Sequence, residues 1–355
     1  MHDPDRRYAA RLAAYGNVSG RLALLSDRRL GAAVASAVPL GSGIGGRSAR
    51  LDVDGTPVFV KRVPLTDLEL RPEHVRSTAN LFELPLYYQY GVGSAGFSAW
   101  RELAAHALTT GWVLGNAYQG FPLMHHWRVL PDTPPEPEAY AGEFGGIDGA
   151  VAHWEGSPAV RERLTALGRA SSSLVLFLEY VPQTLTAWLD GHRAGDAAPY
   201  HWAEKELMRG TAFLASQGFV HFDAHFDNIL TDGRLLYFAD FGLALHSGFE
   251  LTYTEAEFLT RHLPYDRCHT AGHLLHHLLR RVFPDAEPDA VLREWLTGRR
   301  PDGLPPEAAA LLARHAAPAA ALRGFRRRLL TESKRTPFPV DEIEGALAVA
   351  TPAGP

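Results

Sequence analysis

The 355-residue sequence contains a single cysteine, Cys268. One cysteine excludes an internal disulfide framework and a zinc site built from cysteines. The sequence also has no run of 18 apolar residues, the length that predicts a membrane-spanning helix. Its first sixteen residues lack the uninterrupted apolar core of a signal peptide. From these absences we expect a cytoplasmic protein that does not span a membrane.

Charge of one sign is not in large excess either. The chain has 35 Lys and Arg residues against 40 Asp and Glu residues, a net charge of -5. This balance gives no electrostatic reason to expect binding to nucleic acid or to an anionic membrane. The content of 46% hydrophobic and 21% charged residues is that of an ordinary globular protein. The length predicts one large two-lobed domain or two domains.

Local patterns change along the chain from strands to helices. Residues 1–30 have a helical pattern, and the following residues 31–63 are predicted to form strands because Asp54-Gly55 is typical of a two-residue hairpin turn. Later segments predict a helix from Ser98, a buried strand at 172–181, a helix at 201–218 that ends at a glycine, and mainly helices beyond 250. Two stretches look like insertions: 64–97 is irregular, and 131–170 begins with a loop composition up to about 160. The sequence therefore predicts an α+β protein.

The segment VHFDAHFDNILTDGRLLYFADFG, residues 220–242, places costly polar groups between apolar runs. Asp223 and Asn228 lie on a predicted loop, and a hairpin with the turn Asp232-Gly233 leads to Asp240. We expect the hairpin to bring Asp240 near Asn228. Converging carboxylate and amide oxygens suit Mg²⁺, which prefers oxygen ligands and shares them with substrate phosphates. This pattern favours phosphoryl chemistry.

The same segment resembles the motifs of the protein-kinase superfamily, both its bacterial protein kinase-like and its aminoglycoside phosphotransferase-like members. His221, Asp223 and Asn228 match the H-R-D-x-x-x-x-N motif, and residues 240–242 match D-F-G. The resemblance implies a bilobal fold with a small β-rich N-lobe and a larger helical C-lobe. Its expected parts are an N-terminal extension at 1–30, an N-lobe at 31–178 with the insertions 64–97 and 131–170, a hinge and C-lobe at 179–340, and a tail at 341–355.

Upstream segments extend the resemblance to the expected nucleotide site. Gly41, Gly43 and Gly46 match a G-x-G-x-x-G loop that would cover the phosphates, and Lys61 matches the strand lysine that contacts them. The family pairs this lysine with a helix glutamate, for which we choose Glu102, with Glu69, Glu73 and Glu83 as alternatives. The run LEYV resembles the hinge that binds adenine through the backbone. This resemblance assigns Glu179 and Val181 to cofactor binding.

The implied activity is transfer of the γ-phosphoryl group of ATP to a hydroxyl acceptor. Asn228 and Asp240 would hold Mg²⁺, Asp223 would accept or orient the proton of the acceptor, and His221 would support the loop. A protein kinase-like enzyme acting on Ser or Thr is the first expectation, and a small-molecule phosphotransferase is the alternative. An AMP-transferring enzyme and a nucleotide-binding pseudokinase are further alternatives.

Three departures from the family motifs bear on the acceptor. Phe222 replaces the Arg of H-R-D, so the usual partner of a phosphorylated activation segment is missing. His225 stands at the position where protein Ser/Thr kinases usually carry Lys. A His at this position is typical of aminoglycoside phosphotransferases. The segment from Asp240 to Asp266 is short and contains no A-P-E.

Two further patterns predict ordinary packing. In AGHLLHHLLRR, His273, His276 and His277 lie opposite an apolar stripe, which predicts a solvated helix face and not a metal site. The run FRRRLL, residues 325–330, predicts a charged helix face and not an anion-binding patch. Cys268 falls on the apolar side of its helix and is expected in the core.

Overall fold

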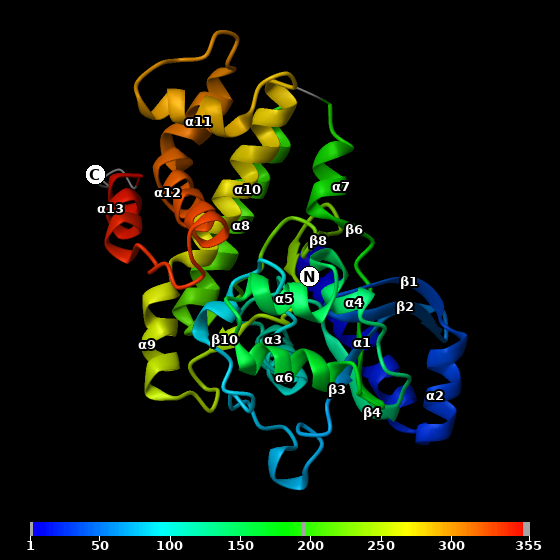
Figure 1. Cartoon of the computed structure of the whole chain (residues 1–355). Helices are drawn as coiled ribbons and strands as arrows, with labels where there is room; N and C mark the ends of the chain where they lie inside the picture. The colour runs from blue at the N-terminus through cyan, green and yellow to red at the C-terminus, as the bar shows by residue number, and fades with distance from the viewer. Residues whose placement is uncertain (1–2, 194–195, 351–355) are drawn as a thin grey trace. The chain divides into compact units, whose positions relative to one another are not determined.

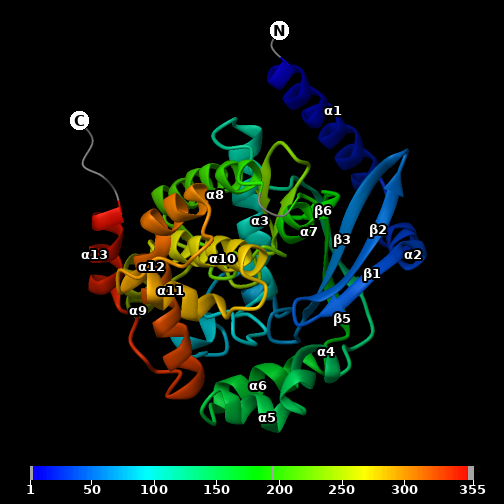
Figure 2. The ribbon, with the colours of Figure 1, turned by 90° about the horizontal axis from the view of Figure 1, so that it is seen from above.

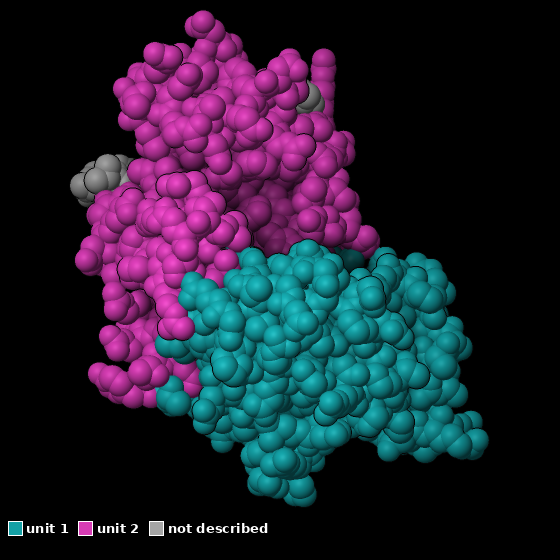
Figure 3. All heavy atoms as spheres, in the orientation of Figure 1, with its two compact units in different colours: residues 1–181, 240–244, 248–252 teal, residues 182–239, 245–247, 253–355 magenta. Residues whose placement is uncertain are grey.

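The computed structural model describes residues 3–193 and 196–350 (Figure 1). The chain divides into two compact units (Figure 3). Unit 1 comprises residues 1–181, 240–244 and 248–252, and unit 2 comprises 182–239, 245–247 and 253–355. The predicted α+β class is confirmed, because a five-stranded antiparallel sheet is accompanied by many helices.

The sheet of unit 1 has the strand order β1-β2-β3-β5-β4, and every neighbouring pair is antiparallel. Its strands are β1 (Val38–Gly43), β2 (Gly46–Val53), β3 (Thr56–Leu65), β4 (Met124–Pro131) and β5 (Ser172–Glu179). The predicted turn at Asp54-Gly55 joins β2 to β3, with both residues at positive φ. The buried strand predicted at 172–181 is β5.

Alternate residues of β5 lie on opposite faces of the sheet, as the two-residue period of a strand requires. Val175 and Phe177 belong to a core with helices α1 (Asp3–Ala23) and α2 (Asp27–Ser36), seen beside the sheet in Figure 2. Leu174, Leu176 and Leu178 belong to a core with α3 (Ala99–Leu114) on the other face. The sheet of unit 1 is therefore covered on both faces.

The expectation of strands from residue 31 is wrong for 31–36, which belong to α2. The Ser26 hydroxyl caps this helix by accepting a hydrogen bond from the Arg29 N–H. Leu30 and Val34 lie four residues apart on one face of α2 and are buried. Burial of this apolar stripe explains why the segment folds as a helix.

The segments expected to be insertions pack together in unit 1. Residues 64 and 65 end strand β3, and residues 66–97 are irregular, as predicted, apart from the short 3-10 helices η1 (Pro72–His74) and η2 (Leu86–Gln89). The expectation of a loop at 131–160 is wrong, because this region contains short helices. These are α4 (Glu138–Ala141), the 3-10 helix η3 (Gly142–Phe144), α5 (Ile147–His153) and α6 (Pro158–Leu167). Aromatic and aliphatic side chains from both segments, among them Tyr88 and Trp154, form one buried core.

Unit 2 is mainly helical. Its helices are α7 (Leu185–Asp190), α8 (Ala198–Ser216), α9 (Tyr253–His262), α10 (Tyr265–Val282), α11 (Pro288–Leu296), α12 (Pro306–Thr331) and α13 (Val340–Ala350). Its short strands are β6 (Gln183–Thr184), β7 (Phe219–Val220), β8 (Ile229–Thr231), β9 (Leu236–Phe238) and β10 (Leu245–His246). The expected tail at 341–355 begins within α13, and its residues 351–355 lie outside the described part. Helix α10 packs against α8 and α12.

The solvated face predicted for α10 is wrong. His273, His276 and His277 are partly buried, because other elements of unit 2 pack against this side of the helix. His277 hydrogen-bonds the Tyr200 hydroxyl through Nδ1 at 2.9 Å. The prediction for Cys268 is confirmed, since its side chain is fully buried. Burial also raises the pKa of this thiol to about 12, so the thiol stays protonated at neutral pH.

Unit 1 contains more of the chain than unit 2, which differs from the small N-terminal part expected from the sequence. Helices α1 and α2 and the two packed insertions account for the difference. Across residues 3–193 and 196–350, every helix is too short or too polar to span a lipid bilayer.

Candidate functional site

A buried lysine of unit 1 contacts two carboxylates. Lys61 Nζ lies 2.7 Å from Glu102 Oε1 and 2.8 Å from Asp240 Oδ1. Strand β3 provides the lysine, and the first turn of α3 provides the glutamate. Helix α3 begins where the sequence predicts, because the Ser98 hydroxyl accepts a hydrogen bond from the Trp100 N–H as the N-cap. The expected pairing of Lys61 with Glu102 is present.

The other three glutamates considered for Lys61 lie elsewhere in unit 1. Glu69 is fully buried and forms an ion pair with Arg163 of α6 at 2.8 Å. Glu69 also accepts hydrogen bonds from the backbone N–H groups of Thr66 and Ala99. Its carboxylate therefore joins the insertions to the start of α3, while Glu73 and Glu83 are exposed.

Two carboxylates share one ammonium group in this cluster. Burial alone would lower the pKa of Lys61, but the carboxylates of Asp240 and Glu102 outweigh burial and raise it. Burial raises the pKa of Glu102 to about 7, and the nearby charge of Asp240 acts in the same direction. The lysine is therefore charged at neutral pH. Two carboxylates and one ammonium group leave negative charge in excess. This excess lies toward Asp240, whose side chain is 41% exposed, and a bound cation could neutralise it.

In the glycine-rich hairpin β1-β2, the packing requires a residue without a side chain at only some of the glycine positions. A Cβ atom on Gly46, which has a φ of +116°, would lie 2.2 Å from the Arg62 carbonyl oxygen. A Cβ atom on Gly45 would lie 3.2 Å from Lys61 Nζ. Gly41 and Gly43 have open space where a Cβ would lie, so the packing of the hairpin does not itself require glycine at these two positions.

Glu179, expected to bind a nucleotide through its backbone, lies at the end of β5. Its backbone N–H donates to the Leu123 carbonyl at 2.8 Å. Its carboxylate accepts hydrogen bonds from Arg11 of α1, with Nη2 2.6 Å from Oε2. Helix α1 is thereby held at the predicted hinge. Val181 is the last residue before the chain passes into unit 2.

The polar loop of unit 2 lies between β7 and β8. Asn228 Nδ2 donates to the Asp223 carbonyl at 3.0 Å and to the carboxylate at 3.1 Å. Strands β8 and β9 form the predicted hairpin, and the Ala239 N–H donates to the Asn228 carbonyl at 2.9 Å. The hairpin therefore returns the chain to Asn228 one residue before Asp240.

A buried aspartate fixes the backbone of this loop. Asp266 of α10 accepts hydrogen bonds from the N–H groups of His221 at 2.6 Å and Phe222 at 3.0 Å. Burial raises the pKa of the Asp266 carboxyl, although His221 and the two N–H groups favour the charged form. Phe222 has a φ of +64°, which is uncommon for a bulky residue. Asp266 thus holds a strained turn directly before Asp223.

His221 joins the loop to the hairpin. Its Nε2 atom lies 2.9 Å from the Ala239 carbonyl oxygen, and its Nδ1 atom lies 3.3 Å from the Asp223 N–H. These contacts require Nε2 to donate and Nδ1 to accept. His221 therefore supports the backbone on both sides of the hairpin.

The residues that depart from the family motifs have distinct surroundings in unit 2. Phe222 is fully buried against the rings of Phe258, His262 and Tyr265. His225 Nε2 lies 3.7 Å from Asp223 Oδ2, where it adds a polar group beside the carboxylate.

No group of three or more His, Cys, Asp or Glu side chains with the geometry to hold a metal occurs among residues 3–193 and 196–350. The magnesium site predicted from Asn228 and Asp240 would combine one carboxylate with one amide and share its other oxygen ligands with substrate phosphates. The Asn228 amide nitrogen donates to Asp223, so the amide oxygen is the atom that would bind a cation.

The roles of Asp266, Gly45 and Arg11 were not predicted from the sequence. Asp266 lies on the side of α10 that carries His273 and His277, opposite the apolar stripe, so its place in the helix did not indicate burial. Gly45 and Arg11 gave no signal either, since their contacts depend on pairing between distant segments.

No protein-family model matches the chain, and no curated protein matches its sequence.

Proposed function

We propose that the protein is an ATP-dependent phosphotransferase that moves the γ-phosphoryl group to a hydroxyl acceptor. The observation that carries this proposal is the buried Lys61 ammonium between the carboxylates of Glu102 and Asp240. A lysine fixed on a strand by a helix glutamate suits contact with the α and β phosphates of a nucleotide. The hairpin turn at Gly45, close to the same ammonium, suits a loop that covers phosphates.

The proposed reaction balances without a further reactant. The acceptor oxygen forms a bond to the γ-phosphorus, the bond from this phosphorus to the β–γ bridging oxygen breaks, and ADP leaves. Asp223 accepts or orients the proton of the acceptor hydroxyl, while His221 and Asp266 hold the loop that carries Asp223. Asn228 and Asp240 are the residues that would hold Mg²⁺, which when bound neutralises charge on the phosphates.

The proposal includes a bilobal protein-kinase-like fold. The antiparallel sheet of unit 1 carries the lysine, and one helix on its face carries the glutamate. The helical unit 2 carries the loop of Asp223 and Asn228. This distribution of motifs over the two units supports an N-lobe and a C-lobe, each with its own share of the chemistry.

Ser or Thr of a protein is the first acceptor class that we propose, and a small hydroxyl compound is the alternative. Two observations in unit 2 favour the alternative. His225 adds a polar group beside Asp223. The buried ring of Phe222 stands at the sequence position where regulated protein kinases carry an arginine. A small acceptor needs less of the activation segment than an extended peptide does.

The test is product analysis with ATP labelled on either the γ or the α phosphate. The purified protein and Mg²⁺ are incubated with peptides that contain Ser or Thr and, separately, with amino-hydroxyl metabolites. We expect the γ label on the acceptor. A matched pair of variants tests the site: Lys61→Met should abolish transfer, and Lys205→Met, at an exposed lysine of α8, should leave it unchanged.

Three outcomes would contradict the proposal. Transfer of the α label would indicate attachment of AMP, and saturable ATP binding without transfer to any acceptor would indicate a pseudokinase. Equal activity of the Lys61→Met variant and the natural protein would exclude the proposed nucleotide site.

A further inference from the structure

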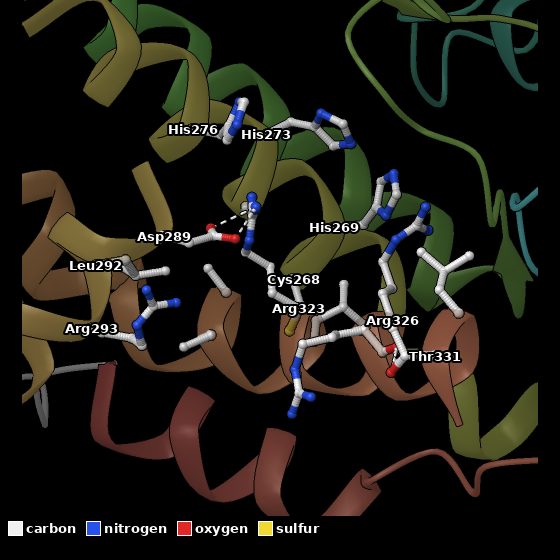
Figure 4. Close-up of a pocket in the computed structure, with 17 residues that line it drawn as sticks. Cys268, His269, His273, His276, Asp289, Leu292, Arg293, Arg323, Arg326 and Thr331 are labelled. Atoms are coloured by element: carbon white, nitrogen blue, oxygen red, sulfur yellow. Dashed lines mark hydrogen bonds and ion pairs between the residues drawn. The ribbon is translucent and has the colours of Figure 1, made fainter. Parts of the chain in front are cut away.

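A hollow of about 670 Å³ lies within unit 2, lined by residues of α10, α11 and α12 (Figure 4). This volume is in the range of small-molecule sites. None of the residues that line it has a role in the proposed phosphoryl transfer. The proposed phosphoryl transfer therefore does not account for the hollow.

Positive charge dominates the lining. Four arginines, contributed by α11 and α12, face the hollow together with a single carboxylate among the described residues that line it. This carboxylate belongs to Asp289, which forms an ion pair with Arg323 at 2.6 Å (Figure 4). One guanidinium is thus neutralised, and Arg327 lies 4.0 Å from the exposed carboxylate of Glu332, which does not line the hollow. Arg293 and Arg326 add further positive charge, so the lining itself carries a positive surplus.

A buried histidine adds an unsatisfied polar atom. His269 is 4% exposed, and its Nε2 atom has no hydrogen-bond partner among the described residues. Leaving such an atom unpaired costs free energy. Figure 4 shows Arg326 reaching from α12 toward His269 on α10. Arg326 is held in place by a hydrogen bond from Nη1 to the Tyr265 hydroxyl at 3.0 Å.

The histidines of the wall are uncharged at neutral pH. Burial lowers the pKa of His269 well below its usual value, and the nearby His273 and Arg326 add to the effect. Burial, together with His225 and Arg326, lowers the pKa of His273 to about 3. The charge of the wall at neutral pH therefore comes from arginine, while the imidazoles offer neutral N–H groups.

We propose that this hollow binds a phosphate-bearing small molecule at a site separate from that of the phosphoryl transfer. Guanidinium groups bind phosphate oxygens through paired N–H donors, and the neutral imidazole of His269 supplies a further donor. The volume leaves room for the organic group that carries the phosphate. The run FRRRLL of α12 thus contributes to an anion site and is not only the charged helix face predicted from the sequence.

Calorimetric titration with inorganic phosphate and with pyrophosphate tests the proposal. Arg327 and Arg328 are neighbours on α12, but only Arg327 lines the hollow. Because a charge-assisted hydrogen bond is lost, we expect Arg327→Gln to weaken phosphate binding by about threefold to tenfold. Arg328→Gln should leave it unchanged, and Arg326→Gln should weaken it by about tenfold or more.

Further measurements separate the alternatives. A thermal melt without phosphate shows whether Arg326→Gln still folds, and the exposed Arg327 provides the test if it does not. Lys61→Met should retain phosphate binding, since the hollow is distinct from the proposed nucleotide site. No saturable binding at millimolar phosphate, equal effects of the Arg327 and Arg328 variants, loss of binding in Lys61→Met, or tighter binding of citrate than of phosphate and pyrophosphate would each overturn the proposal.

Discussion

Asp223 and Asp227 lie on the same loop of unit 2 but differ in their surroundings. The Asp223 carboxylate accepts a hydrogen bond from Asn228, whereas the Asp227 side chain is 66% exposed. We predict that Asp223→Asn lowers the rate of phosphoryl transfer by about 10² to 10⁴, the usual contribution of a general base. ATP binding should persist, because this carboxylate acts on the acceptor.

Single-turnover kinetics and calorimetry with a non-hydrolysable ATP analogue measure the two effects. Asp227→Asn removes the same charge from the same loop and should change neither quantity by more than about twofold. Turnover of Asp223→Asn within a few fold of the natural protein would remove Asp223 from the proposed role.

Asp266 acts on the same loop through the backbone. We predict that Asp266→Asn lowers the turnover rate but leaves the affinity for ATP unchanged, because an amide cannot accept from both N–H groups of His221 and Phe222. The free energy of unfolding should fall by about 1 to 3 kcal/mol, the cost of an unsatisfied buried donor. Urea unfolding and steady-state kinetics check the two effects. A parallel loss of ATP affinity and turnover would indicate general damage to the fold.

Sequence reasoning succeeds for residues whose role is local. Ser98 caps α3 with its own side chain, and Asp54-Gly55 forms a turn by its own backbone preference. It fails where a side chain meets a distant segment. Glu69 was a candidate partner of Lys61, yet it pairs with Arg163, 94 residues away. Nothing in the local pattern around Glu69 specifies that partner.

At the scale of elements, α1 contributes the buried side chains of Val18 and Leu22 to a core on one face of the sheet of unit 1. Leu22 is 1% exposed, whereas Leu24, which follows the helix, is 82% exposed. We predict that Leu22→Ala lowers the free energy of unfolding by about 2 to 5 kcal/mol, through lost burial and the cavity left behind. Leu24→Ala should change it by less than about 0.5 kcal/mol. Urea unfolding compares the two, and equal effects would mean that α1 is not part of the core.

Helices α8 and α12 are joined by Glu204, whose carboxylate contacts Arg314 and His315, each at 2.6 Å. Burial alone would raise the pKa of Glu204, but hydrogen bonds from His315 and Arg314 lower it to about 2. A carboxyl with a lowered folded-state pKa stabilises the fold above its ordinary pKa. This contribution is lost as the pH falls from the ordinary value toward 2.

We therefore predict that Glu204→Gln lowers the free energy of unfolding at pH 7 by about 1 to 2 kcal/mol, a modest figure because Arg314 is partly exposed. The difference from the natural protein should shrink as the pH falls below about 4. Urea unfolding at several pH values measures it. Glu257→Gln, at an exposed glutamate of α9, serves as the control and should have little effect at any pH. A difference that grows toward low pH would contradict this assignment.

The short helices α4 to α6 show a limit of composition as a guide to elements. Proline and glycine around residues 131–160 favour loops, yet Tyr140, Trp154 and Leu164 form a buried core with residues 82–97. Burial of these large side chains favours helices over the local preference. The prediction of a solvated histidine face on α10 was wrong for the same reason. The helical pattern of α10 alone does not indicate that α12 packs against this helix.

For the whole molecule, the buried Phe222 predicts an enzyme that is active as synthesised. Thr252, Tyr253 and Thr254 are exposed in the segment after Asp240-Phe241-Gly242 and are the expected sites of a phosphate switch. Phe222 cannot supply the charge-assisted bonds that would order such a segment. We predict that Thr252→Ala and Thr254→Ala keep most of their activity.

Phosphatase treatment of the purified protein followed by an activity measurement checks this prediction. Activity should stay within about twofold, with mass spectrometry confirming that phosphate is absent. A tenfold fall would show that another residue, such as Arg261, replaces the missing arginine.

Unit 1 is completed only late in the synthesis of the chain. Unit 1 is assembled from residues 1–181 and two later pieces, 240–244 and 248–252. At about 5 to 20 residues per second, several seconds separate the appearance of Val181 from that of Asp240 on the ribosome. Until then, Lys61 has only one of its two carboxylate partners. A fragment that ends at Val181 would therefore lack part of its own unit, and the N-terminal half of this protein must wait for its C-terminal half before its buried lysine is fully paired.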